Sequence, residues 1–92
     1  SLVVPRAHFE RLFDAPAEVQ AAVWDLVESV RRELTARLRP VGYNVGINEG
    51  ACAGQTILHA HVHVIPRFDG EVQDPRGGIR WVIPERARYW DE

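Results

Sequence analysis

Polar and apolar positions alternate strictly in one stretch in the second half of the chain. The alternation consists of three histidines separated by small or branched apolar residues: His59, Ala60, His61, Val62, His63 and Val64. Successive side chains of a β-strand point to opposite faces, so the pattern predicts a strand with three imidazoles on one face. We expect this strand to occupy residues 55–67.

A different period marks the first half of the chain. Apolar residues recur there at steps of three and four: Val19, Val23, Leu26, Val27, Val30, Leu34 and Leu38. This spacing predicts an amphipathic helix of roughly twenty residues that packs one face on a sheet. Pro16 fits its first turn, and Pro40 fits its end. Two pairs of opposite charge lie four residues apart on its polar side, Glu28 with Arg32 and Glu33 with Arg37.

Two further segments have the pattern of strands, and together with the histidine strand and the helix they predict an α+β fold. We expect an antiparallel sheet with this one long helix packed on it. Residues 2–4 form a short β-rich run that ends at Pro5, and residues 42–48 alternate well enough for a further strand. A loop of small residues, 49–54, separates the latter from the histidine strand. We therefore expect the two strands to pair as an antiparallel hairpin with a short connection.

The C-terminal residues differ in character from this core. We expect a single domain over residues 1–92, with a core at about 2–67 and an arm at about 68–92. Residues 74–78 form a turn signal, and residues 79–83 are expected to be a short strand or an extended arm. The aromatic residues of the arm need a packing surface, which a partner subunit would provide: Trp81, Tyr89 and Trp90.

Composition excludes several classes of function. A net charge of −2 argues against a general nucleic-acid binder, and no apolar run is long enough to cross a membrane. Cys52 is the single cysteine, which excludes an internal disulfide and a cysteine-based zinc knuckle and fits a reducing cytoplasm. All eleven basic residues are arginine, and Arg76 and Arg80 in the arm suggest contacts to a polyphosphate.

Three imidazoles on one face allow two kinds of chemistry. Histidines on a strand can bind zinc, with His8 or Glu49 as a further ligand, or an imidazole can attack a phosphorus centre. The loop before the histidines contains small residues and glycines, which let backbone N–H groups approach an anion closely. This loop favours a phosphate site over a metal site, and we expect no resident metal.

Three segments together resemble the histidine triad (HIT) superfamily of nucleotide hydrolases and transferases. They are Asn48-Glu-Gly50, Ala53-Gly-Gln-Thr56 and His59-Ala-His-Val-His-Val-Ile65. The opening Val3–His8 is similar to the family's strand and upstream histidine, and the arm is similar to that of a bacterial branch of dinucleoside polyphosphate hydrolases. The resemblance implies a HIT-like dimer. It also implies a preceding N-terminal part that walls the nucleoside pocket and is missing here, which puts base and ribose recognition in doubt.

The resemblance implies a role for each histidine. His61 would attack the α-phosphorus and form a nucleotidyl-histidine intermediate, while its other ring nitrogen donates to a backbone carbonyl near His59. His63 would hydrogen-bond the phosphate oxygens and stabilise the charge that builds there. His59 would orient the other two and connect to His8. Water would then hydrolyse the intermediate and release a nucleoside monophosphate.

Further residues would bind the phosphate or the leaving group beside His63: Asn48, Gly54, Gln55 and Thr56. The expected substrate is a dinucleoside polyphosphate or a related adenylyl compound. No cofactor is strictly required, although a divalent cation could accompany the polyphosphate. The alternatives are a phosphoramidate hydrolase, a nucleotidyltransferase, a metal-binding module and a non-catalytic nucleotide-binding protein.

Overall fold

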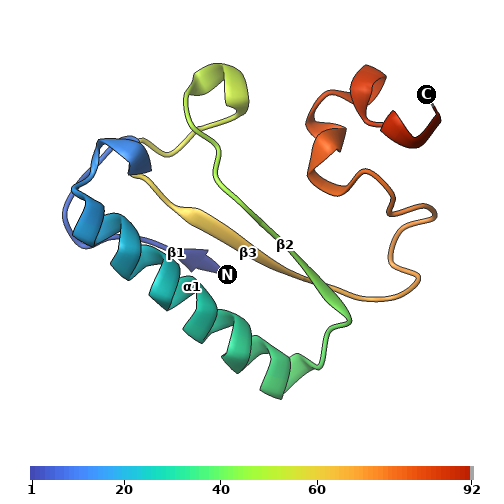
Figure 1. Ribbon diagram of the computed structural model, residues 1–92, viewed down its shortest axis with the longest axis horizontal. Helices are drawn as coiled ribbons and strands as arrows, with labels where there is room; N and C mark the ends of the chain where they lie inside the picture. The colour runs from blue at the N-terminus through green and yellow to red at the C-terminus, as the bar shows by residue number, and fades with distance from the viewer. Residues whose placement is uncertain (92) are drawn as a thin grey trace.

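The computed structural model describes residues 1–91, and over these residues the α+β architecture is confirmed. Its main elements are strand β1 (Leu2–Val3), helix α1 (Ala17–Leu38), strand β2 (Gly42–Gly46) and strand β3 (Val62–Arg67). Figure 1 shows α1 lying along one side of the strands, with the C-terminal residues beyond β2. Within the described part of the chain, no helix is long and apolar enough to cross a membrane.

The sheet places β3 at its centre. Within residues 1–91 the sheet has three strands in the order β1-β3-β2, and both pairings are antiparallel. His63 is paired with Leu2 on one side and Gly46 on the other. The predicted pairing of the second strand with the histidine strand is therefore confirmed. The connection between them is much longer than expected, because β2 ends at Gly46 and β3 begins only at Val62.

The histidine strand is shorter than the sequence pattern suggested. His59 and His61 precede β3, although the predicted alternation holds: Ala60, Val62 and Val64 are buried and the three histidines are half-buried. The strand cannot extend further back because its partner β1 has only two residues. The Ala60 N–H instead donates to the Phe9 carbonyl at 2.6 Å, so a loop takes the place of the missing ladder.

Helix α1 supplies the second half of the core. Val23 and Val27 are buried against the sheet, with Val30 and Leu34 partly buried beside them. Arg39 adopts a left-handed conformation at the C-terminal end, directly before Pro40, so the helix stops close to where the sequence predicted. Both expected ion pairs are present, Glu28 with Arg32 at 2.9 Å and Glu33 with Arg37 at 3.6 Å.

Three residues of the predicted apolar stripe lie outside the core cluster: Val19, Leu26 and Leu38. Leu26 and Leu38 are each 48% exposed. Leu26 borders a shallow cavity with Val4, next to β1. The sheet is narrow there because β1 is short, so it cannot cover the full width of the stripe. Leu38 is the last residue of α1, at the end of a 22-residue helix.

The C-terminal arm contains no strand over residues 79–83, so that expectation is wrong. Gly78–Val82 instead forms a 3₁₀ turn, followed by two further turns at Pro84–Arg86 and Tyr89–Asp91. Gly77 and Gly78 have φ angles of 96° and 51°, which direct the chain into a turn rather than into an extended strand. The last residue of the predicted arm, Glu92, lies outside the described residues.

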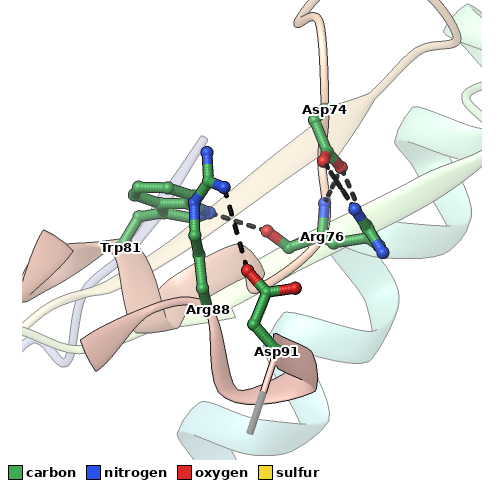
Figure 2. Close-up of polar contacts among 5 residues, drawn as sticks. All are labelled: Asp74, Arg76, Trp81, Arg88 and Asp91. Atoms are coloured by element: carbon green, nitrogen blue, oxygen red, sulfur yellow. Dashed lines mark hydrogen bonds and ion pairs between the residues drawn. The ribbon is translucent and has the colours of Figure 1, made fainter. Parts of the chain in front are cut away.

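The arm is held by contacts around Arg76. Asp74 accepts hydrogen bonds from the Arg76 guanidinium, and the Trp81 indole N–H donates to the Arg76 carbonyl at 2.7 Å, as Figure 2 shows. The same guanidinium lies over the Trp90 ring, 4.6 Å from its centroid. Arg76 therefore contacts both Trp81 and Trp90 within the same chain, and the partner subunit stays a prediction.

Candidate functional site

The histidines of the sequence are arranged as two neighbouring pairs of rings. The ring centroids of His8 and His59 are 5.0 Å apart, and those of His61 and His63 are also 5.0 Å apart. In both pairs the rings meet edge to face. The fold thus brings the upstream His8 to the triad, as the sequence analysis anticipated.

The orientation of His61 is set by the backbone two residues earlier. Its Nδ1 lies 2.8 Å from the carbonyl oxygen of His59. A carbonyl oxygen can only accept, so Nδ1 carries the hydrogen of this bond. In the neutral ring the lone pair is then on Nε2, the nitrogen directed away from that carbonyl. The predicted contact is present, and it leaves the Nε2 lone pair free of this bond.

His59 is itself fixed by a bond to the opening segment. Its Nε2–H donates to the carbonyl of Pro5 at 2.9 Å, which joins residues far apart in sequence. Pro5 is buried, so this acceptor is held firmly. Because the His59 carbonyl holds His61, the bond to Pro5 helps to position the next imidazole as well. The sequence analysis missed Pro5, since no local pattern marks a backbone carbonyl as a partner.

His63 borders a cavity between the sheet and the C-terminal arm. It lies on β3 between the other two strands, and the adjoining cavity has a volume of about 440 Å³. Asn48 lines the same cavity, so the structure brings together two residues that the sequence analysis assigned to the phosphate. Ile79 and Val82 of the arm also line it. The sequence offered no signal for these two, because the arm was expected to be extended.

Gln55 is engaged in the protein interior. Its side chain is 7% exposed and accepts a hydrogen bond from the Gly50 N–H at 2.9 Å. Its amide nitrogen donates to the carbonyls of Glu10 and Ile57, at 2.7 and 3.1 Å. In this structure Gln55 ties two loops together. A direct contact with phosphate would require some of these bonds to break, and it stays a prediction.

Two N–H groups at the end of the small-residue loop are bonded within the loop itself. The Gly54 N–H donates to the Ala51 carbonyl at 3.0 Å, and the Gln55 N–H donates to the Gly50 carbonyl at 3.1 Å. Both donors are used within the loop, so a contact of the Gly54 N–H with phosphate would require this turn to open, and it stays a prediction. Gly54 borders a second cavity beside Cys52 and Asn48.

The remaining expected residues lie at the surface. Thr56 and His8 are exposed, and their roles stay predictions. Glu49 is half-buried, and its Oε1 atom has no hydrogen-bond partner in the described residues. Over residues 1–91, no group of three or more His, Cys, Asp or Glu residues is arranged to hold a metal ion. The preference for phosphate over metal therefore still rests on the sequence.

Known proteins are similar in sequence to most of this chain. The model of the HIT domain family matches residues 1–70 of this chain. An uncharacterized HIT-like protein from Mycoplasma pneumoniae is 38% identical over 69 residues, covering 75% of this chain and 48% of the relative. An adenylylsulfatase from Arabidopsis thaliana is 36% identical over 67 residues, covering 73% of this chain and 34% of the relative. The chain thus spans half or less of the length of these relatives.

A solved structure shares the fold. The zinc-bound histidine triad family protein from Mycobacterium smegmatis superposes with a TM-score of 0.71 at 35% sequence identity. The match covers 79% of this chain and 53% of that protein.

Proposed function

The chain belongs to the histidine triad family, and on this premise we propose that it is a nucleotide hydrolase that works through His61. The proposed substrates are dinucleoside polyphosphates or related adenylyl compounds, which are cleaved at the α-phosphate. The adenylylsulfatase relative supports this class of substrate, because an adenylyl group is a nucleoside monophosphate in ester, amide or anhydride linkage.

The observation that carries the proposal is the hydrogen bond from His61 Nδ1–H to the His59 carbonyl, at 2.8 Å. It holds the ring in one tautomer and one orientation, so the Nε2 lone pair is available without a prior rearrangement. The His63 ring, 5.0 Å away, lies where it can donate to a phosphate oxygen as negative charge develops. A histidine placed only for packing would not need this tautomer.

The proposed reaction has two displacements. His61 Nε2 attacks the α-phosphorus, a P–N bond forms, and the bond to the leaving group breaks, with the electron pair passing to the leaving atom. A water molecule then attacks the same phosphorus, and the P–N bond breaks with its electron pair returning to Nε2. The proton lost by the water passes to solvent or to the departed group. Two smaller barriers replace one large barrier, and no cofactor is required for the balance.

Replacement of the nucleophile tests the proposal. We expect His61→Ala to reduce the turnover of a diadenosine polyphosphate by a factor on the order of 10³ or more. The thermal unfolding curve should show a folded protein. Wild-type chain quenched during turnover should carry a covalent nucleotidyl group on His61, visible by mass spectrometry at alkaline pH.

Two results would contradict this mechanism. Turnover by His61→Ala close to the wild-type rate would exclude His61 as the nucleophile. Tight nucleotide binding by the wild-type chain with no turnover would instead indicate the non-catalytic nucleotide-binding alternative. Offering an adenosine phosphoramidate beside the polyphosphate would separate the two kinds of hydrolase.

A further inference from the structure

Gly46 on β2 lies directly opposite His63 in the sheet. The two residues are partners in the antiparallel pairing of β2 with β3. Side chains of paired residues lie on the same face of an antiparallel sheet, so a side chain at position 46 would stand beside the His63 imidazole. Both residues line the cavity of about 440 Å³. The absence of a side chain at position 46 therefore adds to the open space next to His63.

The backbone does not require a glycine at position 46. The φ angle of Gly46 is outside the positive range that favours glycine. The pairing of β2 with β3 is continuous from Gly42 to Gly46, so no bulge explains it either. Glycine lowers the stability of a strand, because it loses more conformational freedom on folding and has no side chain to pack. A strand glycine of this kind often marks the close approach of another backbone or of a ligand.

No other backbone segment approaches Gly46. Over residues 1–91, a Cβ atom added at Gly46 would have no heavy atom within 4 Å apart from its own chain neighbours. Gly77 in the arm is different, since a Cβ atom there would lie 2.9 Å from the Trp81 indole nitrogen and 3.0 Å from the Ala87 carbonyl. The protein's own packing thus requires the glycine at position 77. At position 46 the space is left for a ligand.

The polar groups around this space are hydrogen-bond donors. Asn44 and Asn48, two residues to either side of Gly46, line the same cavity as His63. The Asn44 Oδ1 atom accepts a hydrogen bond from the Arg67 guanidinium, so the amide of Asn44 has its NH2 group left to donate. In the described part of the chain, no Asp or Glu side chain lines this cavity, and the rest of its lining is apolar: Val45, Ile47, Ile65, Ile79 and Val82. Donors with no carboxylate beside them suit an anionic oxygen acceptor such as phosphate.

We propose that Gly46 is a specificity-determining residue of the site. Its missing side chain leaves the room in which a phosphate group of the substrate lies beside His63, within reach of the Asn44 and Asn48 amides. A branched side chain at position 46 would fill part of this room and exclude a group of that size. The inference rests on the proposed hydrolase function, in which His63 binds phosphate.

Side chains of increasing size at position 46 test the inference, with diadenosine tetraphosphate as the substrate. We expect Gly46→Val to raise KM by about tenfold or more and to change kcat by a smaller factor, because the side chain takes up ligand space without touching His61. Gly46→Ala should raise KM less, since its side chain is shorter. Both variants should resist urea at least as well as the wild-type chain, because alanine and valine suit a strand better than glycine.

Gly42→Val provides the matched control. Gly42 lies on the same strand and has the same open space around it, but it is paired with Arg67 and does not line the cavity beside His63. The control should keep the wild-type KM. An unchanged KM in Gly46→Val, or an equal rise in Gly42→Val, would overturn the inference, while turnover by the wild-type chain would leave the hydrolase proposal intact. If the wild-type chain neither cleaves diadenosine tetraphosphate nor binds adenosine monophosphate, the proposed function fails, and the inference fails with it.

Discussion

At the scale of single residues, two side chains illustrate opposite outcomes. His61 donates to a carbonyl only two residues away, so its orientation follows from the local chain. Gln55 bonds to Glu10, 45 residues earlier, and so depends on how the whole chain folds. The family pattern suggested a substrate contact for both. The structure gives His61 an orientation suited to that role and uses Gln55 to join loops.

Removal of the Gln55 amide should destabilise the protein. Gln55→Ala leaves the Gly50 N–H and the carbonyls of Glu10 and Ile57 without their partner in a part-buried place. We expect a loss of about 2 kcal/mol in the free energy of unfolding, measured by urea denaturation. The neighbouring Thr56 is exposed, so Thr56→Ala should change stability by less than about 0.5 kcal/mol. Equal effects of both variants would contradict the structural role of Gln55.

At the scale of elements, β3 connects the core with the site. Val62 and Val64 face α1 and are completely buried, while His63 and Ile65 face the opposite way. The alternation that the sequence showed is therefore the means by which one strand serves both faces. A shift of one residue in its pairing would bury imidazoles and expose the core.

The two faces of β3 should respond differently to truncation. Val64→Ala removes two methyl groups from a fully buried position and should cost about 2 kcal/mol of unfolding free energy. Ile65→Ala removes more atoms, but Ile65 is exposed and borders the cavity beside His63, so its cost should stay below about 1 kcal/mol. Chemical denaturation of both variants measures the difference. A larger loss at Ile65 would mean that β3 faces the other way.

At the scale of the whole molecule, the arm is a small folded unit beside the sheet. In Figure 1 it lies across β2 from α1, and its own contacts centre on Arg76. The Arg76 side chain and N–H donate to the Asp74 carboxylate and hold the pKa of Asp74 below its usual value. Dimerisation and a cytoplasmic location stay predictions.

The Asp74 pKa gives a test of the arm. Because the pKa is lowered by folding, the Asp74–Arg76 contact stabilises the arm above the ordinary pKa of an aspartate and is lost as the pH falls through the lowered value. Arg76→Gln should return the Asp74 pKa toward its ordinary value in an NMR titration. It should also speed amide hydrogen exchange in the arm. The amides of β3 should keep their protection, and loss there would show that arm and core unfold together.

Local periodicity accounts for what the sequence determined. The helix and the common face of the histidines both follow from side chains spaced by the geometry of their own element. The ion pairs on α1 were predictable for the same reason. The orientation of His61 was implied by the family resemblance, and its partner carbonyl lies only two residues away.

Only the tertiary structure decided where the histidine strand begins, what Gln55 binds and where the arm lies. Each depends on contacts between distant segments. The short strand β1 limits the length of β3, and the Gln55 amide donates to the Glu10 carbonyl. The turn at Gly78 lies close to Asn44 of β2. Such contacts have no period in the sequence, because they arise when loops close and backbone groups find partners. The row of histidines could therefore be predicted from the sequence, whereas the cavity beside His63 could not.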